Sequence, residues 1–488
     1  MSITWLSIVY YAYWVILIYV TLQIIHQYTI SSRASAWLFT VYIFPVVGVI
    51  LYFIFGVKRR KRKMFEQKLS ANQKSLEAYQ AKFATESREV IQQHKDQLKQ
   101  FHGLTKMVYR DASSRLTIKN KLTLLENGEQ KFPQLFKDIS QAKQTIHLEY
   151  YIFKFDDIGG QLVSLLIERA KAGVEVRFIY DDYGCLGLNN SVLQRMRSYG
   201  IEAWPFAEIN LFAFTERLNY RNHRKIVIID GEIAYLGGIN VGDEYVNKED
   251  VEPNGLFWRD SHLKIEGQGV SYLQNIFLND WNFCTGQDIE IEEALLPHYK
   301  DLPAADNKML QVVSSGPDSP QPTILFSILQ AIHSAKSEIL ITTPYFIPNP
   351  SLIKALKIAV ISGVSVKILV PRQSDSWVVN KASQSYYFEL LQTGIEFYQY
   401  TKGFVHVKTM VVDGFLSIMG TANFDERSFE LNFEVNVLIY DNDFAEQLRK
   451  SFTQDMNDST QLDYKTWKKR SAFKIFTEKV ARLISPIL

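Results

Sequence analysis

The sequence is poor in cysteine. Its 488 residues contain only Cys185 and Cys284, and neither belongs to a CxxC pair or to another metal-ligand spacing. The sequence therefore predicts neither a disulfide framework nor a zinc site. Scarce cysteine also favours a reducing compartment for the catalytic part. A chain of this length is long enough for two or three domains, each with its own core.

The net charge is small as well. The chain has 54 Lys and Arg against 52 Asp and Glu, which leaves a formal net charge of +2 at pH 7. Proteins that bind nucleic acid do so through broad basic surfaces, so this balance argues against a nucleic-acid partner.

Charged residues are absent from the first 32 positions. Residues 3–25 and 34–57 are uncharged runs long enough to cross a bilayer as helices, and six consecutive cations, Lys58–Lys63, follow the second run. Cations at a span's end favour the cytoplasmic side. We therefore expect two transmembrane helices in residues 1–63, with the N-terminus and the catalytic part in the cytoplasm. A cleaved signal peptide fits poorly because no basic segment precedes the first run. Two buried core helices are the other alternative.

An α/β pattern occupies the middle of the chain. A polar helical linker is expected at residues 64–115, and strand–helix–strand patterns then occur twice, which predicts βαβ units and a partly parallel sheet in each of two domains, 116–300 and 301–464. We place the boundary near residues 297–307. The segments concerned are Thr145–Phe153, 161–172 and 174–180 in the first domain, and 338–343, 352–361 and 364–370 in the second.

The C-terminal segment, residues 465–488, is basic and amphipathic. A helix of this kind can lie in a lipid interface. It can also dock on the preceding domain through its apolar face. The sequence leaves both interpretations open.

One motif is present twice. His223-x-Lys225-x4-Asp230 recurs 183 residues further along as His406-x-Lys408-x4-Asp413, and the following Gly and Asn residues keep the same offset. A match at this many positions indicates an internal duplication. The flanking pairs are Gly231 and Gly414, Gly237 and Gly420, and Asn240 and Asn423.

Each copy of the motif predicts a strand that ends in a tight hairpin turn at Asp230-Gly231 or Asp413-Gly414. Side chains two apart on a strand point the same way, so His223 and Lys225 would share a face. For Asp230 and Asp413 we favour a structural role in the turn.

A His and a Lys supplied twice suit phosphodiester transfer without a metal. One His can attack phosphorus, and the other can protonate the leaving oxygen and then deprotonate the incoming hydroxyl. Positive charge must surround the phosphate oxygens, for which we predict Lys225 and Lys408 with help from Asn240 and Asn423. Since neither copy holds all these parts, both must converge on one site.

A catalytic His usually needs a partner that fixes its tautomer. The candidates are Asp260 in the segment WRDSH and Glu434 in the segment LNFEVN, each downstream of its motif. His262 lies two residues beyond Asp260, and we predict no role for it.

These residues resemble the phospholipase D superfamily, whose signature is two copies of H-x-K-x4-D with a downstream Gly and Asn. Within it, nearly the whole chain is similar to bacterial cardiolipin synthases. The similarity is most specific in the two motif segments, RNHRKIVIIDGEIAYLGGIN and FVHVKTMVVDGFLSIMGTANFDERSFELNFEVN, and extends to FWRDSHLKIEG and to the two N-terminal apolar runs.

The resemblance implies a multi-pass protein of the bacterial cell membrane that joins two phosphatidylglycerol molecules into cardiolipin and releases glycerol. It implies His223 as nucleophile, His406 as acid and base, and no cofactor or metal. Four alternatives remain: a phospholipase D-type hydrolase with water as acceptor, a phosphatidylserine synthase, a nuclease, and a non-catalytic scaffold. The two spans and the small net charge argue against the nuclease, and two complete motifs argue against the scaffold.

Overall fold

The computed structural model describes residues 5–27, 31–53, 68, 87–206, 220–247, 257–289 and 306–483. The chain forms two compact units, one of residues 1–70 with 209–219 and one of residues 71–208 with 220–488. The predicted basic cluster Lys58–Lys63 and most of the predicted boundary at 297–307 lie outside the described residues.

The N-terminal unit is helical where it is described. Its helices are α1 (Trp5–Gln27), α2 (Ser31–Ile43) and α3 (Pro45–Leu51), and Leu17, Val20, Ile24, Val41 and Tyr52 pack into a small core of their own. The second predicted span is divided between α2 and α3, because Pro45 begins a new helix at a position where its missing amide hydrogen costs nothing. No helix among the described residues is long and apolar enough to cross a membrane, so the two predicted spans are not found there.

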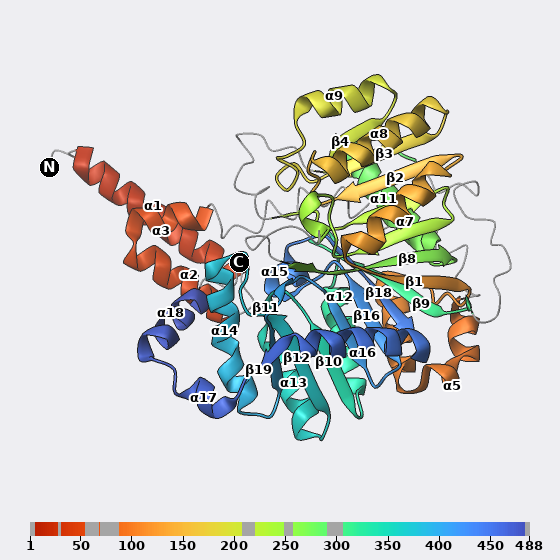
Figure 1. Cartoon of the computed structure of the whole chain (residues 1–488). Helices are drawn as coiled ribbons and strands as arrows, with labels where there is room; N and C mark the ends of the chain where they lie inside the picture. Colours follow the sequence, from red (N-terminus) through yellow and green to blue (C-terminus); the bar gives the residue numbers. More distant parts are fainter. Residues whose placement is uncertain are drawn as a thin grey trace. The chain divides into compact units, whose positions relative to one another are not determined.

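The larger unit is built on two mixed sheets. The first has the strand order β1-β8-β6-β5-β2-β3-β4 (Figure 1). Strands β2, β3 and β4 run parallel, as the βαβ pattern predicts, and the remaining neighbours are antiparallel. The strands are β1 (Asn120–Glu126), β2 (Thr145–Tyr150), β3 (Glu175–Tyr180), β4 (Glu202–Pro205), β5 (Ile226–Ile229), β6 (Ile233–Gly237) and β8 (Ser261–Gly267).

The second sheet repeats this order and adds one edge strand. It runs β9-β18-β16-β15-β10-β12-β13-β19, so each of its first seven strands has a counterpart in the first sheet. This confirms the predicted duplication. The strands are β9 (Met309–Ser315), β10 (Glu338–Thr342), β12 (Ser365–Pro371), β13 (Glu396–Tyr400), β15 (Thr409–Val412), β16 (Leu416–Gly420), β18 (Glu434–Tyr440) and β19 (Ser459–Gln461).

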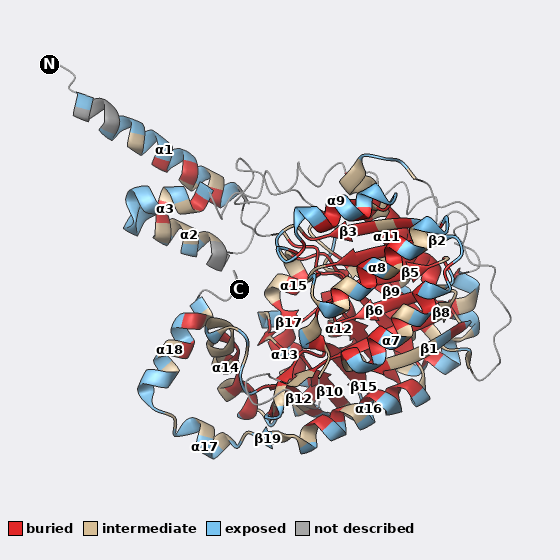
Figure 2. Ribbon diagram, turned by 45° about the horizontal axis from the view of Figure 1, so that its top comes forward, coloured by how far each residue is buried: buried red, intermediate tan, exposed pale blue. Residues whose placement is uncertain are grey.

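Helices cover both sheets and bury their central strands (Figure 2). The crossover helices α8 (Asp157–Lys171) and α13 (Pro350–Ile361) correspond to the two predicted helices, and each begins at an Asx cap: Asp156 accepts from the Gly159 amide and Asn349 from the Leu352 amide. The other covering helices are α7 (Asn127–Ser140), α9 (Asn190–Ser198), α11 (Val270–Thr285), α12 (Thr323–Ser334), α14 (Trp377–Leu391) and α16 (Asn442–Asn457).

The described part of the polar linker belongs to the core of the second half. Apart from Lys68, it comprises residues 87–115 with α5 (Lys95–Leu98), a short 3-10 turn η2 (Lys99–Phe101) and α6 (His102–Ala112). Four of its apolar residues, Leu98, Phe101, Leu104 and Val108, are fully buried in the same cluster as the second sheet.

The C-terminal segment forms α17 (Tyr464–Lys468) and α18 (Ala472–Leu483), and α18 docks on α14. Ala481 is buried in this contact, and Glu478 accepts a hydrogen bond of 2.6 Å from Arg470. The opposite face is not covered: Phe473 is 75% exposed and Leu483 79%. The docking interpretation is thus confirmed for one face, while the other face leaves an apolar stripe in solvent.

Candidate active site

Both histidines lie just outside the strands that were predicted to hold them. His223 and Lys225 precede β5, and His406 and Lys408 lie between β14 (Gly403–Val405) and β15. The reason is that the backbone amide of each histidine forms a hydrogen bond to a carbonyl of the other half of the unit. The amide of His223 donates to the carbonyl of Phe433 at 3.0 Å, and the amide of His406 donates to that of Arg259 at 2.7 Å.

This pairing exchanges the histidines' partners between the halves. The residue after Phe433 is Glu434, whose carboxylate lies 2.9 Å from His223 Nδ1. The residue after Arg259 is Asp260, whose carboxylate lies 2.7 Å from His406 Nδ1. Both candidate orienting residues therefore contact a histidine, but each contacts the histidine of the opposite half.

The carboxylates set the tautomer of each ring. A carboxylate only accepts hydrogen bonds, so each Nδ1 holds the proton and each Nε2 holds the lone pair. Burial lowers the pKa of His223 and of His406 to about 4, despite the opposing effect of the carboxylates. Burial alone would raise the pKa values of Glu434 and Asp260, but the adjacent histidines and lysines lower them. At neutral pH the free site therefore has two neutral imidazoles and two carboxylates.

Lys225 and Lys408 are buried next to the histidines of their own motifs. The Lys225 Nζ donates to the carbonyl of His223 at 2.7 Å, and the Lys408 Nζ lies 2.9 Å from His406 Nδ1. Burial lowers the pKa of Lys225 to about 7 and that of Lys408 to about 8. A phosphate that binds beside these lysines would favour their protonated form and would be met by their positive charge.

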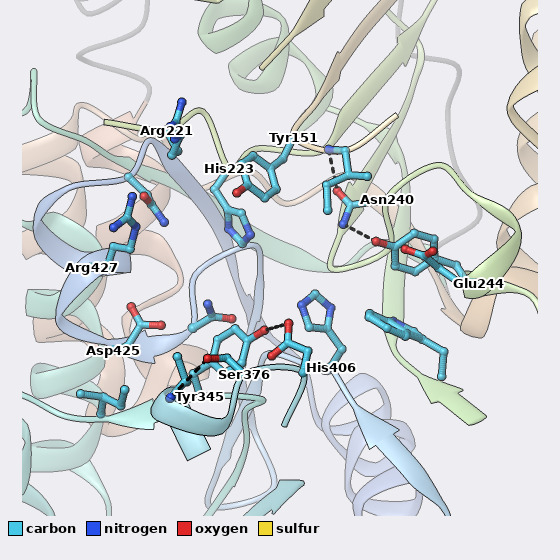
Figure 3. Close-up of a pocket in the computed structure, with 18 of the residues that line it drawn as sticks. Tyr151, Arg221, His223, Asn240, Glu244, Tyr345, Ser376, His406, Asp425 and Arg427 are labelled. Atoms are coloured by element: carbon cyan, nitrogen blue, oxygen red, sulfur yellow. Dashed lines mark hydrogen bonds between the residues drawn. The ribbon is translucent and has the colours of Figure 1, made fainter. Parts of the chain in front are cut away.

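The histidines share one cavity of about 1010 Å³. Figure 3 shows His223 and His406 near its middle, which is the single shared site that the motif chemistry requires. Aromatic rings border both histidines: Tyr151 lies edge-on to His223 with a centroid distance of 4.8 Å, and Trp258 lies 5.3 Å from His406. The cavity is also lined by Arg221, Asn240, Asp243, Glu244, Tyr245, Asn247, Phe257, Tyr345, Asp375, Ser376, Asn423, Asp425, Arg427 and Asn432.

The repeated asparagines are not equivalent. Asn240 uses both ends of its amide within the protein, since Oδ1 accepts from the Ile152 amide at 3.2 Å and Nδ2 donates to the Tyr245 hydroxyl at 2.9 Å. Asn423 lines the same cavity, and its buried Oδ1 has no hydrogen-bond partner among the described residues. Asn423 is therefore the better placed of the two to meet a substrate.

Asp230 and Asp413 lie away from the cavity and fix the opposite end of the sheets. Both adopt the left-handed conformation of the predicted hairpin turn, with φ of 53° and 51°. Asp230 accepts from the amides of residues 143, 144 and 145, and Asp413 accepts from those of residues 336, 337 and 338. These bonds anchor the first residues of β2 and β10, the strands next to the motif, so the geometry gives both aspartates a structural place.

The repeated glycines allow the strands that hold the acids to approach. A Cβ at Gly237 would lie 2.7 Å from the carbonyl oxygen of Ser261, and one at Gly420 would lie 2.3 Å from that of Val435. Ser261 and Val435 directly follow Asp260 and Glu434. Any side chain at these glycines would therefore push the orienting acid strand away. His262 is fully buried beside Gly237 and does not line the cavity.

Sequence reasoning missed several residues that line the cavity, namely Arg221, Arg427, Asp425, Tyr151 and Trp258. Arg221, Arg427, Asp425 and Trp258 stand close to a motif or to an acid segment, and Tyr151 directly follows β2. None of them shares a residue type with the other half. A search for identical repeated residues therefore passes over them. The only sequence signal that could have identified these cavity residues was their position along the chain.

Comparison with known proteins agrees with this geometry. A family model described as "Cardiolipin synthase, PLD-like domain" matches residues 135–281 and 328–456, and each matched stretch holds one histidine motif and one orienting acid. A cardiolipin synthase of Geobacillus sp. (strain WCH70) is 38% identical over 94% of this chain and 89% of its own length. The chain belongs to the cardiolipin synthase family.

Other relatives of the cardiolipin synthase family lead to the same conclusion. A probable cardiolipin synthase of Bacillus subtilis (strain 168) is 39% identical over 94% of this chain and 89% of its own length. The predicted resemblance is thereby confirmed. The crystal structure of phosphatidylserine synthase from Haemophilus influenzae Rd KW20 is similar in fold, with a TM-score of 0.61 and 14% identity over 79% of this chain and 100% of that one.

Proposed function

We propose that this member of the cardiolipin synthase family transfers a phosphatidyl group between two phosphatidylglycerol molecules and thereby makes cardiolipin and glycerol. The observation that supports this most directly is the pair of neutral histidines, each held by a carboxylate of the opposite half, on one cavity. The cavity's volume of about 1010 Å³ is at the upper end of ordinary ligand pockets, which suits two head groups.

In the first step, His223 Nε2 attacks the phosphorus of one lipid. A P–N bond forms, the P–O bond to the terminal glycerol breaks, and the leaving oxygen takes a proton from His406. His406 must hold that proton beforehand. The arriving phosphate supplies the reason, because a negative charge nearby raises the pKa of a buried histidine.

In the second step, the terminal hydroxyl of another phosphatidylglycerol attacks the phosphohistidine. His406 takes the hydroxyl proton, a P–O bond forms, and the P–N bond to His223 breaks. Lys225 and Lys408 offset the charge on the phosphate oxygens in both steps, and Glu434 and Asp260 hold the rings in place. The overall reaction is reversible, since it exchanges one phosphodiester for another.

The test is to supply the purified chain with vesicles of phosphatidylglycerol, without added metal, and to identify all products by mass spectrometry. Cardiolipin and free glycerol in equal amounts are expected. Phosphatidic acid without cardiolipin would make water the acceptor and the chain a hydrolase. Strong inhibition by EDTA, reversed by a divalent ion, would contradict the metal-independent mechanism.

We also propose that the chain works at a membrane surface through α18. The exposed residues Phe473, Phe476, Val480 and Leu483 recur at helical spacing, and Lys474 and Lys479 are exposed beside them. An apolar stripe flanked by cations suits an anionic lipid interface. Replacing Phe473 and Phe476 by Ala should weaken sedimentation with phosphatidylglycerol vesicles, whereas replacing the exposed Ile361 on α13 should not. Equal loss in both variants would argue against α18.

The two membrane spans and the cytoplasmic position of the catalytic part remain proposals. They rest on the uncharged residues 1–32, on the second uncharged run at 34–57 and on the cations at 58–63. Removing residues 1–63 should release much of the protein from bacterial membranes while activity toward added vesicles persists. An insoluble or unfolded product would mean that these residues are needed for folding.

A further inference from the structure

The internal repeat is broken at the walls of the cavity. The offset of 183 residues that relates the motifs also relates Glu244 to Arg427 and Arg221 to Phe404. Glu244, Arg427 and Arg221 all line the cavity. Figure 3 shows Arg221 and Arg427 on one side of the histidines and Glu244 on the other. A cavity with two similar halves therefore has one wall with two arginines, the cationic wall, formed by Arg221, Arg427 and the neighbouring Asn432 on the side where Asp425 also lies, and one wall with Glu244 and aromatic rings.

The cationic wall is a built part of the fold. Arg221 is only 5% exposed, and its guanidinium lies 4.2 Å from the centre of the Tyr183 ring. The nearest ion-pair partner of Arg221 is Asp181, at 3.9 Å, a distance beyond hydrogen-bond reach. Asp181 instead accepts from the backbone amides of residues 183, 184 and 222. Arg221 thus lines the cavity with a guanidinium that stacks on Tyr183 and makes no direct hydrogen bond to Asp181.

Arg427 is tied to the same wall through its backbone. Its carbonyl accepts from the Asn432 amide at 3.0 Å, and the Phe433 amide donates to the carbonyl of Arg221 at 2.9 Å. Both guanidiniums act on one group: burial raises the pKa of Tyr151 to about 12, and Arg221 and Arg427 oppose that rise. Arg221 and Arg427 come from different segments, and both line the cavity on the side of His223, where Tyr151 lies edge-on to that histidine.

The wall also has acceptors that no described residue satisfies. Asn432 donates from Nδ2 to Glu434 at 3.2 Å, which fixes its amide orientation because a carboxylate cannot donate. Its Oδ1 is buried and has no hydrogen-bond partner among the described residues, and the same holds for Asn423 Oδ1. Leaving a buried acceptor unmet is unfavourable, so each of these oxygens points to a ligand that donates.

We propose that the cationic wall binds the phosphate of the acceptor lipid, with Asn432 and Asn423 accepting from the hydroxyls of its glycerol. This rests on the proposed function and deepens it. The donor lipid has one phosphate, which is consumed at the histidines. The donor and the acceptor lipid together bring two phosphates, and in cardiolipin these two phosphates are separated by one glycerol. Since water and glycerol have no phosphate, the wall selects phosphatidylglycerol over both.

The experiment compares two acceptors in one reaction. The full chain is given phosphatidylglycerol vesicles and deuterated glycerol, and the initial rates of cardiolipin and of deuterated phosphatidylglycerol are measured. The two products share the first step and differ only in the acceptor. Arg427→Gln should lower the ratio of cardiolipin to deuterated phosphatidylglycerol about tenfold or more, and Arg427→Lys should restore part of it. Lys450→Gln, which removes an exposed charge on α16, should leave the ratio unchanged.

Each outcome decides the matter. An unchanged ratio in Arg427→Gln would overturn the proposal, because the cationic wall would then have no part in choosing the acceptor. An equal fall of both products, in a variant whose thermal unfolding matches the wild type, would also overturn it, because the wall would then act on the reacting phosphate of the donor. Arg221→Gln is a second variant for the same comparison. If the wild type forms deuterated phosphatidylglycerol but no cardiolipin, the acceptor site is wrong while the histidine chemistry stands. If it forms neither, the proposed function itself fails.

Discussion

The two halves of the catalytic unit have the same strand order and the same motif, yet neither half contains a finished catalytic group. His223 depends on Glu434 of the second half, and His406 depends on Asp260 of the first. The repeat is therefore symmetric at the two histidines, and each half supplies the acid that contacts the histidine of the other half. It is asymmetric where substrate is bound, since Arg427 corresponds to Glu244 and the free amide oxygen of Asn423 corresponds to a satisfied one in Asn240.

This difference teaches how one duplication can serve two molecules of the same lipid. The reacting phosphate meets equivalent groups from both sides, so a symmetric centre suits it. The two lipids themselves have different roles, as one loses glycerol and the other gains a phosphatidyl group. Unequal walls can distinguish them while the centre remains shared.

The largest expected effect comes from removing either histidine. His223→Ala and His406→Ala should each lower cardiolipin formation by at least about 10⁴-fold, and the double variant should be no worse, because the two groups act as one unit. Initial rates in phosphatidylglycerol vesicles check this. Trapping with labelled lipid separates the roles: label on protein is expected in His406→Ala and not in His223→Ala. Label only in His223→Ala would reverse the two assignments.

The exchanged partners give the next largest effect. Asp260→Asn and Glu434→Gln keep side-chain size but can donate to Nδ1, which favours the wrong tautomer; a loss of about 10²–10⁴-fold is expected. Histidine NMR can follow the pairing directly. Because the carboxylate raises the pKa of its histidine, Asp260→Asn should lower the pKa of His406 and leave that of His223 nearly as it was. A shift of His223 instead would mean that the partners are not exchanged.

The pH dependence of the transfer rate should reflect the titration of the two buried histidines and of the two buried lysines. Below a pH of about 4 both histidines are protonated and the nucleophile is lost, and above it His406 of the free enzyme loses the proton that the leaving oxygen needs. Because kcat/KM reports the free enzyme, it should be highest near pH 4 and decline toward neutral pH. As pH rises through about 7 and 8, Lys225 and Lys408 lose their charge, so kcat/KM should fall further. Bound phosphate raises all four pKa values, and the kcat profile should therefore lie at higher pH than the kcat/KM profile. An unshifted kcat profile would show that the lysines do not contact the substrate.

Local patterns in the sequence sufficed to predict much of this molecule. The βαβ segments around residues 145–180 and 338–370 are strands and a helix as expected, because alternating apolar residues and terminal glycines are local signals. The left-handed turns at Asp230 and Asp413 follow from the same kind of signal. The candidate acids Asp260 and Glu434 were also found, since both lie on strand-like segments near a motif.

The pairing of those acids could not be predicted in the same way. Which acid meets which histidine depends on backbone bonds between residues about 150 to 210 positions apart, such as that from His223 to Phe433. No local pattern encodes that pairing. The cationic wall was missed for a related reason: a repeat is recognised by what its copies share, whereas Arg221 and Arg427 matter because their counterparts differ.

The smallest expected effect concerns the third residue of each motif, and it separates folding from catalysis. Asp413→Asn and Asp230→Asn keep a residue that tolerates positive φ, so they test hydrogen bonds rather than backbone strain. Each should lower stability by about 1–3 kcal/mol, measured by denaturant unfolding, with little loss of transfer at low temperature. The Asp413→Asn variant should lose more stability than Asp230→Asn, because Asp413 also accepts hydrogen bonds from Gln100 Nε2 at 2.9 Å and from the Ser337 hydroxyl at 2.8 Å. A loss of activity as large as that of a histidine variant, in a protein that remains folded, would instead place these aspartates in the chemistry and show that all three residues of the motif act together at the phosphate.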